Sequence, residues 1–100
     1  MKFIEIREAL KDKKLIKKSY PQAIQSKLEY FIKDILDAPR NLNSVGKPEE
    51  LKHTEFPTFS RELTKKDRIV YGIEPGVNYD MPEETEVVVF YQYLNHYEDK

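Results

Sequence analysis

The stretch FSRELTKKDRIVYGIE, residues 59–74, decides the fold of this chain. Residues 59–64 alternate in side-chain pattern, and residues 68–74 are rich in Ile, Val and Tyr, as β-strands are. Lys65, Lys66 and Asp67 lie between the two patterns and predict a tight turn. We therefore expect two antiparallel strands joined by this turn.

A third strand is expected further along the chain, over residues 87–93, where Val and aromatic side chains follow one another. The long connection before it contains Pro75, Gly76 and Pro82, which are typical of loops. Consecutive strands of this kind form a meander, so residues far apart in sequence can meet on one face of the sheet.

The segments before residue 59 predict mainly helices. Residues 8–18 form one helical pattern, and the helix that follows Pro21 ends before Ala38-Pro39. Its apolar side chains recur at helical spacing along one face: Ile24, Leu28, Phe31, Ile32, Ile35 and Leu36. Residues 2–6 fit a short strand or a helix, and residues 40–57 read as irregular. We expect one α+β domain over residues 1–100, with two N-terminal helices packed on a small antiparallel sheet.

Composition limits the class of protein. The chain has 100 residues, no cysteine and a net charge of −1, and it contains no apolar run of the ~18 residues that a membrane helix needs. Residues 1–68 carry sixteen Lys and Arg against eleven Asp and Glu, whereas residues 69–100 carry one against seven. We expect a cytoplasmic protein without disulfides or a membrane partner.

A basic cluster lies in the first predicted helix, at Lys11, Lys13, Lys14, Lys17 and Lys18. A solvated helix face is the simpler interpretation, because charge runs mostly serve solubility. A surface for a polyanion or an acidic partner is the alternative, since a local patch can bind even when the total charge is near zero.

Several standard sites are disfavoured. Two histidines and no cysteine offer a poor ligand set for zinc, and three glycines cannot build a glycine-rich phosphate loop. We expect no metal and no cofactor. The remaining candidates for chemistry lie near the predicted strands: Glu49, Lys52, Arg61, Arg68, His96 and Tyr97.

Each candidate also has a structural interpretation. Glu49 fits a solvated loop acid, Arg68 fits a pair with Asp67 or Glu62, and His96 fits a strand end. Their joint presence is what favours a functional site, because a carboxylate, a cation and an imidazole can supply a base, a charge stabiliser and an acid.

Four motifs together resemble the RelE/YoeB (Txe) group of bacterial toxins from type II toxin-antitoxin pairs. They are GKPEELKH at 46–53, FSRELT at 59–64, RIVY at 68–71 and the closing HY at 96–97. The resemblance implies a ribosome-dependent mRNA endonuclease that cleaves RNA by attack of its own 2′-OH.

The same resemblance implies roles for individual residues. Glu49 matches the general base, His96 the acid that protonates the 5′-oxygen leaving group, and Arg68 the cation that stabilises the phosphorane. The implied RNA contacts are Lys47, Lys52, Arg61 and, near the target nucleotide, Tyr97.

Position 62 departs from the family pattern, which has a second arginine where this chain has Glu62. Since side chains alternate along a strand, Arg61 shares the side of Phe59 and Leu63, and Glu62 points the other way. We expect Arg61 at the sheet margin, reaching the site over Phe59, and Glu62 neutralising a neighbouring lysine.

Three functions remain open on this sequence: the mRNA endonuclease, a ParE-like gyrase inhibitor, and an inactive member still bound by its antitoxin. The acidic 74–86 loop and Glu62 favour the last of these. The partners implied are a cognate antitoxin, mRNA and the ribosome, with a homodimer as a further assembly. An acidic antitoxin segment is expected on the Lys11–Lys18 helix or on the face that carries residues 49–96.

Overall fold

The computed structural model describes residues 1–82 and 85–95, so His96 and Tyr97 lie outside the described residues. Two helices and a five-stranded sheet make up the described chain. In chain order the elements are β1 (Phe3–Glu5), α1 (Arg7–Ser19), α2 (Gln22–Asp37), β2 (Glu49–Glu50), β3 (Thr58–Glu62), β4 (Arg68–Pro75), the 3-10 helix η1 (Gly76–Tyr79) and β5 (Glu86–Gln92).

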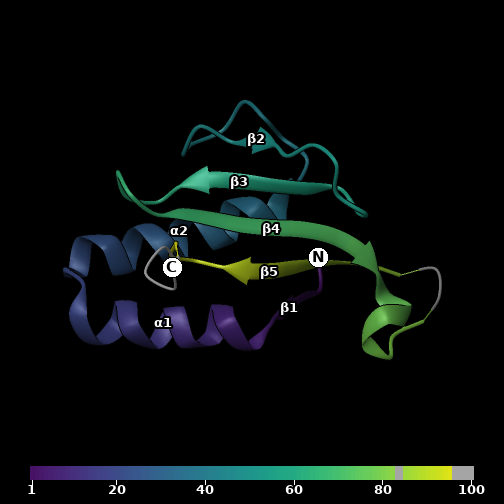
Figure 1. The fold of residues 1–100 in the computed structure, drawn as a ribbon, viewed down its shortest axis with the longest axis horizontal. Helices are drawn as coiled ribbons and strands as arrows, with labels where there is room; N and C mark the ends of the chain where they lie inside the picture. Colours follow the sequence, from purple (N-terminus) through teal and green to yellow (C-terminus); the bar gives the residue numbers. More distant parts are fainter. Residues whose placement is uncertain (83–84, 96–100) are drawn as a thin grey trace.

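The sheet has the strand order β1-β5-β4-β3-β2 (Figure 1). Strands β3, β4 and β5 form the expected antiparallel meander. The predicted fold class, two N-terminal helices packed on a small sheet, is confirmed. The sheet is mixed and not antiparallel throughout, because β1 pairs with β5 in parallel, with Phe3 opposite Val88. The first and last strands are thus neighbours, and the fold is an α+β arrangement of two helices on a mixed sheet.

The helices cover one face of the sheet: α2 lies behind β3 and β4 in Figure 1, and α1 runs along the β5 side. Buried side chains from both helices meet the inward side chains of the strands in one core, which includes Leu28, Ile35, Tyr71, Phe90 and Tyr93. Alternation places the residues between these strand positions on the opposite face, called the outer face below.

The stretch expected to be irregular contains a short strand. Glu49 and Glu50 form β2, which pairs antiparallel with β3 and places Glu49 opposite Ser60. A backbone bond from the Leu51 N–H to the Thr58 carbonyl, at 2.8 Å, continues the pairing. Two residues carry no recognisable strand period, which is why the sequence pattern missed this edge strand.

Candidate active site on the outer face of the sheet

Arg68 is the best-fixed cation on the outer face. Its Nε donates to the Ser60 hydroxyl at 2.9 Å, and its Nη2 donates to the backbone carbonyls of Lys47 at 3.1 Å and Ser60 at 3.3 Å. These acceptors come from β3 and from the loop before β2. The guanidinium is therefore oriented before any ligand arrives, which is what a group meant to stabilise developing charge requires.

Glu49 lies beside this arginine. One carboxylate oxygen of Glu49 is 3.5 Å from Arg68 Nη2, and its side chain is 64% exposed. An ion pair this exposed contributes little to stability, typically ~0–1 kcal/mol. The structure thus brings together the predicted base and the predicted cation and leaves the carboxylate open to solvent.

Glu62 and Lys47 flank the same site. Glu62 is the cross-strand neighbour of Arg68, and its Oε1 lies 3.6 Å from the Lys47 ammonium. The expectation that Glu62 would neutralise a neighbouring lysine is confirmed. Because Glu62 shares a face with Arg68, a carboxylate lies next to the cation of the candidate site.

Arg61 does not lie where the sequence suggested. It was expected at the sheet margin, reaching RNA over Phe59, but its side chain is fully buried on the helix face. Its Nη1 donates to the Asp34 carboxylate at 2.6 Å, and its Nε donates to the Tyr71 hydroxyl at 3.0 Å. Strand alternation sends Arg61 inward with Phe59, so the expected RNA contact by Arg61 is corrected to a buried ion pair.

The partners of Arg61 were missed by the sequence analysis. Asp34 lies on α2 and also accepts a bond from the Ser44 hydroxyl at 2.5 Å. That bond, followed by the bond from Arg61, holds the pKa of Asp34 below its usual value near 3.8. Of the side-chain nitrogens of Arg61, Nη2 has no hydrogen-bond partner among the described residues, so burial of the guanidinium depends on Asp34.

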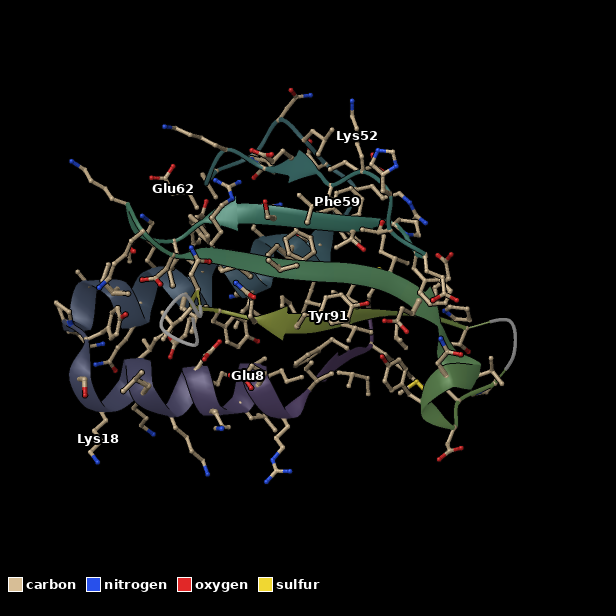
Figure 2. All side chains as sticks on the ribbon, viewed as in Figure 1. Glu8, Lys18, Lys52, Phe59, Glu62 and Tyr91 are labelled. Atoms are coloured by element: carbon tan, nitrogen blue, oxygen red, sulfur yellow. The ribbon has the colours of Figure 1, made fainter. Side chains whose placement is uncertain are left out.

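Lys52 lies in the loop that follows β2, extends away from the sheet and is exposed (Figure 2). Glu50 of β2 and residues 51–57 of this loop line a pocket of about 500 Å³. Lys52 is thus exposed near β2, and no contact joins it to the Glu49–Arg68 pair in the part of the chain that the structure describes.

The acid predicted at His96, together with Tyr97, falls outside the described residues. The chain immediately before them is anchored by two buried aspartates. Asp12 accepts the N–H groups of Tyr93 and Leu94, at 2.9 and 3.1 Å, and Asp67 accepts the Asn95 N–H at 3.1 Å. The Asn95 side chain in turn accepts the backbone N–H of Arg68 at 3.2 Å, so the described chain ends beside the candidate site.

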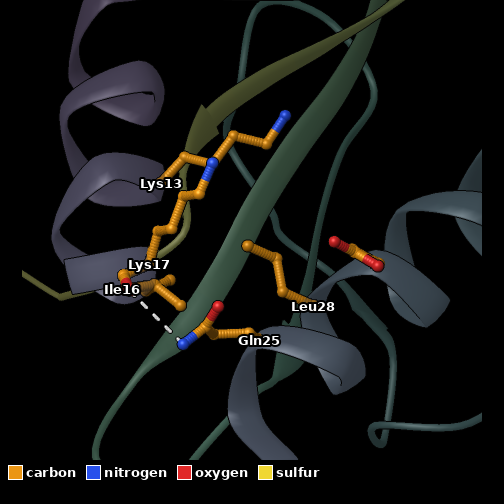
Figure 3. A pocket seen from close by; sticks show the side chains of 6 residues that line it. Lys13, Ile16, Lys17, Gln25 and Leu28 are labelled. Atoms are coloured by element: carbon orange, nitrogen blue, oxygen red, sulfur yellow. Dashed lines mark hydrogen bonds between the residues drawn. The ribbon is translucent and has the colours of Figure 1, made fainter. Parts of the chain in front are cut away.

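A second concave surface lies between the helices (Figure 3). It has a volume of about 330 Å³, and its lining combines apolar with basic and polar side chains: Lys13, Ile16, Lys17, Gln25, Leu28 and Glu29. The Gln25 amide donates to the Lys17 carbonyl across it at 3.4 Å. The basic face of α1 thus borders a groove.

Metal and membrane sites find no support in residues 1–82 and 85–95. No group of three or more His, Asp or Glu side chains there could hold a metal ion. None of the described helices is long and apolar enough to cross a membrane.

A family model and several solved structures match this chain over nearly its whole length. Residues 6–97 match a family model described as the YoeB-like toxin of bacterial type II toxin-antitoxin system. No curated protein matches the chain. A solved YoeB/ParE toxin from Agrobacterium tumefaciens superposes with a TM-score of 0.74 at 22% identity, covering 97% of this chain and 100% of that one.

Two further solved structures share the fold. The YoeB dimer from Staphylococcus aureus has a TM-score of 0.71 at 21% identity, covering 97% of this chain and 98% of that one. A chain of the DinJ-YafQ complex from E. coli has a TM-score of 0.66 at 16% identity, with 94% and 91% covered. At these identities the solved structures establish the architecture alone.

Proposed function

The chain belongs to the family of YoeB-like toxins of bacterial type II toxin-antitoxin systems, and we propose that it is a ribosome-dependent mRNA endonuclease that inhibits translation. The observation that carries the proposal is the pair on the outer face: an exposed Glu49 carboxylate 3.5 Å from an Arg68 guanidinium that three further acceptors hold in place.

The proposed reaction needs a base, an acid and a cation. Glu49 takes the proton from a ribose 2′-OH, and the 2′-oxygen attacks the adjacent phosphorus. Arg68 stabilises the negative charge that develops on the phosphorane oxygens. His96 protonates the departing 5′-oxygen, so the products are a 2′,3′-cyclic phosphate and a free 5′-hydroxyl.

RNA contacts are proposed at two exposed lysines in the segments that flank β2, and at Tyr97. Lys47 and Lys52 are exposed and can neutralise phosphates, and Tyr97 would stack near the target nucleotide. Arg61 is left out of this group because its guanidinium is buried against Asp34.

Mapping of mRNA ends after induction tests the proposal. Glu49→Gln and His96→Gln should each reduce cleavage by ~10²-fold or more while the protein stays folded. Wild-type cleavage by either variant would reject the assignment of base and acid. Arg68→Gln should be similarly impaired, whereas Arg40→Gln, which breaks the exposed 3.6 Å pair with Glu86 away from the site, serves as its matched control.

One observation favours a second function, that of an inactive member that binds only its antitoxin. Glu62 lies opposite Arg68 on the outer face, and its carboxylate forms an ion pair with the Lys47 ammonium. On this alternative, induction leaves mRNA intact and growth unaffected, yet the chain still forms a complex with its antitoxin. A gyrase inhibitor would instead leave mRNA intact and arrest DNA supercoiling.

We also propose a cognate antitoxin and a homodimer as assemblies. Among solved proteins of the same fold, one from Staphylococcus aureus is a heterotetrameric YoeB-YefM complex and another is a YoeB dimer. For this chain, the basic groove between α1 and α2 and the face around Arg68 are the two surfaces that suit an acidic segment.

A further inference from the structure

Every residue of the loop 44–47 forms a hydrogen bond to a helix or a strand. The Ser44 hydroxyl donates to Asp34, the Val45 carbonyl accepts from Arg61 at 3.3 Å, and the Gly46 carbonyl accepts the Glu62 N–H at 2.7 Å. The fourth residue, Lys47, accepts from Arg68. Four consecutive residues thus connect α2, β3 and β4.

The Arg61–Asp34 ion pair is the centre of these contacts. Its 2.6 Å bond joins the sheet to α2, and each partner makes one further bond to the loop, Asp34 to Ser44 and Arg61 to Val45. A buried arginine without its carboxylate would be strongly unfavourable, so the two partners hold each other in one arrangement.

The backbone of the loop gives these bonds their direction. Gly46 has φ +83° and Lys47 has φ +50°, both in the left-handed region, so the chain reverses sharply there. The reversal aims the Gly46 and Lys47 carbonyls at β3 and at the Arg68 guanidinium. Two residues later the chain enters β2 at Glu49, beside the same guanidinium.

We infer that Arg61 and Asp34 are positioning residues of the proposed active site: their ion pair fixes the 44–47 loop, which holds Arg68 through the Lys47 carbonyl and delivers Glu49 to it. The catalytic part of this inference rests on the proposed function. It replaces RNA binding by Arg61 with an indirect role, and the two roles have different kinetic consequences.

The test uses two variants and two measurements. Arg61→Lys keeps the charge but removes the planar fork that serves Asp34, Val45 and Tyr71 at once. Ser44→Ala removes only the hydroxyl at the edge of the network, so it remains informative if Arg61→Lys fails to fold. The measurements are kcat and KM for cleavage of mRNA on programmed ribosomes, and hydrogen exchange of the Glu62 amide, whose N–H bonds to Gly46.

For a positioning role, kcat should fall by ~10²-fold in Arg61→Lys and ~10-fold in Ser44→Ala, because a misplacement on the order of 1 Å has effects of this size, while KM stays within about twofold. Exchange at the Glu62 amide should accelerate relative to amides in the middle of β5. Tyr79→Phe is the matched control: it removes a part-buried hydroxyl bond, to Glu74 at 3.1 Å, at the other end of β4 and should leave kcat unchanged.

Three results would overturn the inference. A raised KM with unchanged kcat and a shallower salt dependence would restore Arg61 as an RNA contact. Unchanged kcat with unchanged exchange at Glu62 in a folded variant would show that the network positions nothing. An equal loss of kcat in Tyr79→Phe would show a general effect of stability. If wild-type protein cleaves no RNA, the proposed function fails, and the exchange measurement alone still decides whether the ion pair fixes the loop.

Discussion

Replacement of Glu62 tests the electrostatics of the outer face directly. Its carboxylate is the cross-strand neighbour of Arg68 and lies 3.6 Å from the Lys47 ammonium. If the chain binds RNA as proposed, an RNA phosphate competes with this carboxylate for Lys47. We expect Glu62→Gln to raise the affinity for single-stranded RNA, because it frees Lys47 from its ion pair. Glu62→Arg should raise the affinity further, because it frees Lys47 and also adds a second cation.

The magnitude follows from the geometry of the pair. Two unit charges at this separation interact by ~1 kcal/mol in water, and the water value applies because the Lys47 side chain is 84% exposed. Measured exposed pairs fall at ~0–1 kcal/mol. Releasing Lys47 should therefore tighten RNA binding by up to ~5-fold. For Glu62→Arg, the slope of log affinity against log salt should steepen by ~0.7, the value for one added contact to single-stranded RNA.

Fluorescence anisotropy with a short single-stranded RNA over a range of salt concentrations provides the assay. Asp37→Arg makes the same change in net charge on the exposed surface of α2, away from the groove between the helices, and should leave the slope nearly unchanged. Unchanged affinity and unchanged slope in a folded Glu62→Arg variant would show that position 62 lies outside the RNA path and would refute the reasoning.

Four further outcomes are expected. Gly46→Ala should lower the free energy of unfolding by ~1–3 kcal/mol in chemical denaturation, because φ is +83° and an added Cβ would lie 2.6 Å from Phe31; stability equal to wild type would contradict this. Because the pKa of Asp34 is lowered on folding, its ionised form contributes stability above the unfolded value near 3.8, and that contribution is lost as pH falls through the folded pKa. The stability difference between wild type and Asp34→Asn should therefore shrink on acidification below that value, and a difference that grows there would reverse the sign of the argument. Tyr97→Ala should weaken RNA cleavage less than loss of the base does, since a stacking contact is worth ~1–3 kcal/mol, and complete inactivation of a folded variant would assign Tyr97 a catalytic role. Co-expression with the cognate antitoxin should yield a complex and restore growth, whereas free monomer without rescue would count against the partner.

Local pattern in the sequence was enough for most of the architecture. The helical spacing from Ile24 to Leu36 predicted α2, the alternation over residues 59–64 predicted β3, and the Ile, Val and Tyr residues after the turn predicted β4. These signals depend on a residue and its near neighbours, so they survive without tertiary information. The same alternation predicted that Glu62 and Arg61 point to opposite faces, which the structure confirms.

Pairings between distant segments were decided by the tertiary structure alone. Strand β1 is three residues long, and its parallel partner β5 lies at the other end of the chain. Strand β2 has two residues, too few for any period. In both cases the strand forms because the adjacent strand supplies its hydrogen bonds. The sequence of so short a segment does not indicate which strand it will pair with.

The site divides in the same way. Residue types and motifs in the sequence singled out Glu49 and Arg68, and in the structure a Glu49 carboxylate oxygen lies 3.5 Å from Arg68 Nη2. The burial of Arg61 could not be predicted from the sequence. A charged side chain is buried only where an opposite charge pairs with it, and the partner here, Asp34, lies 27 residues earlier on α2. Local sequence determined which way each strand side chain points, and the packing of the helices on the sheet decided what each one meets.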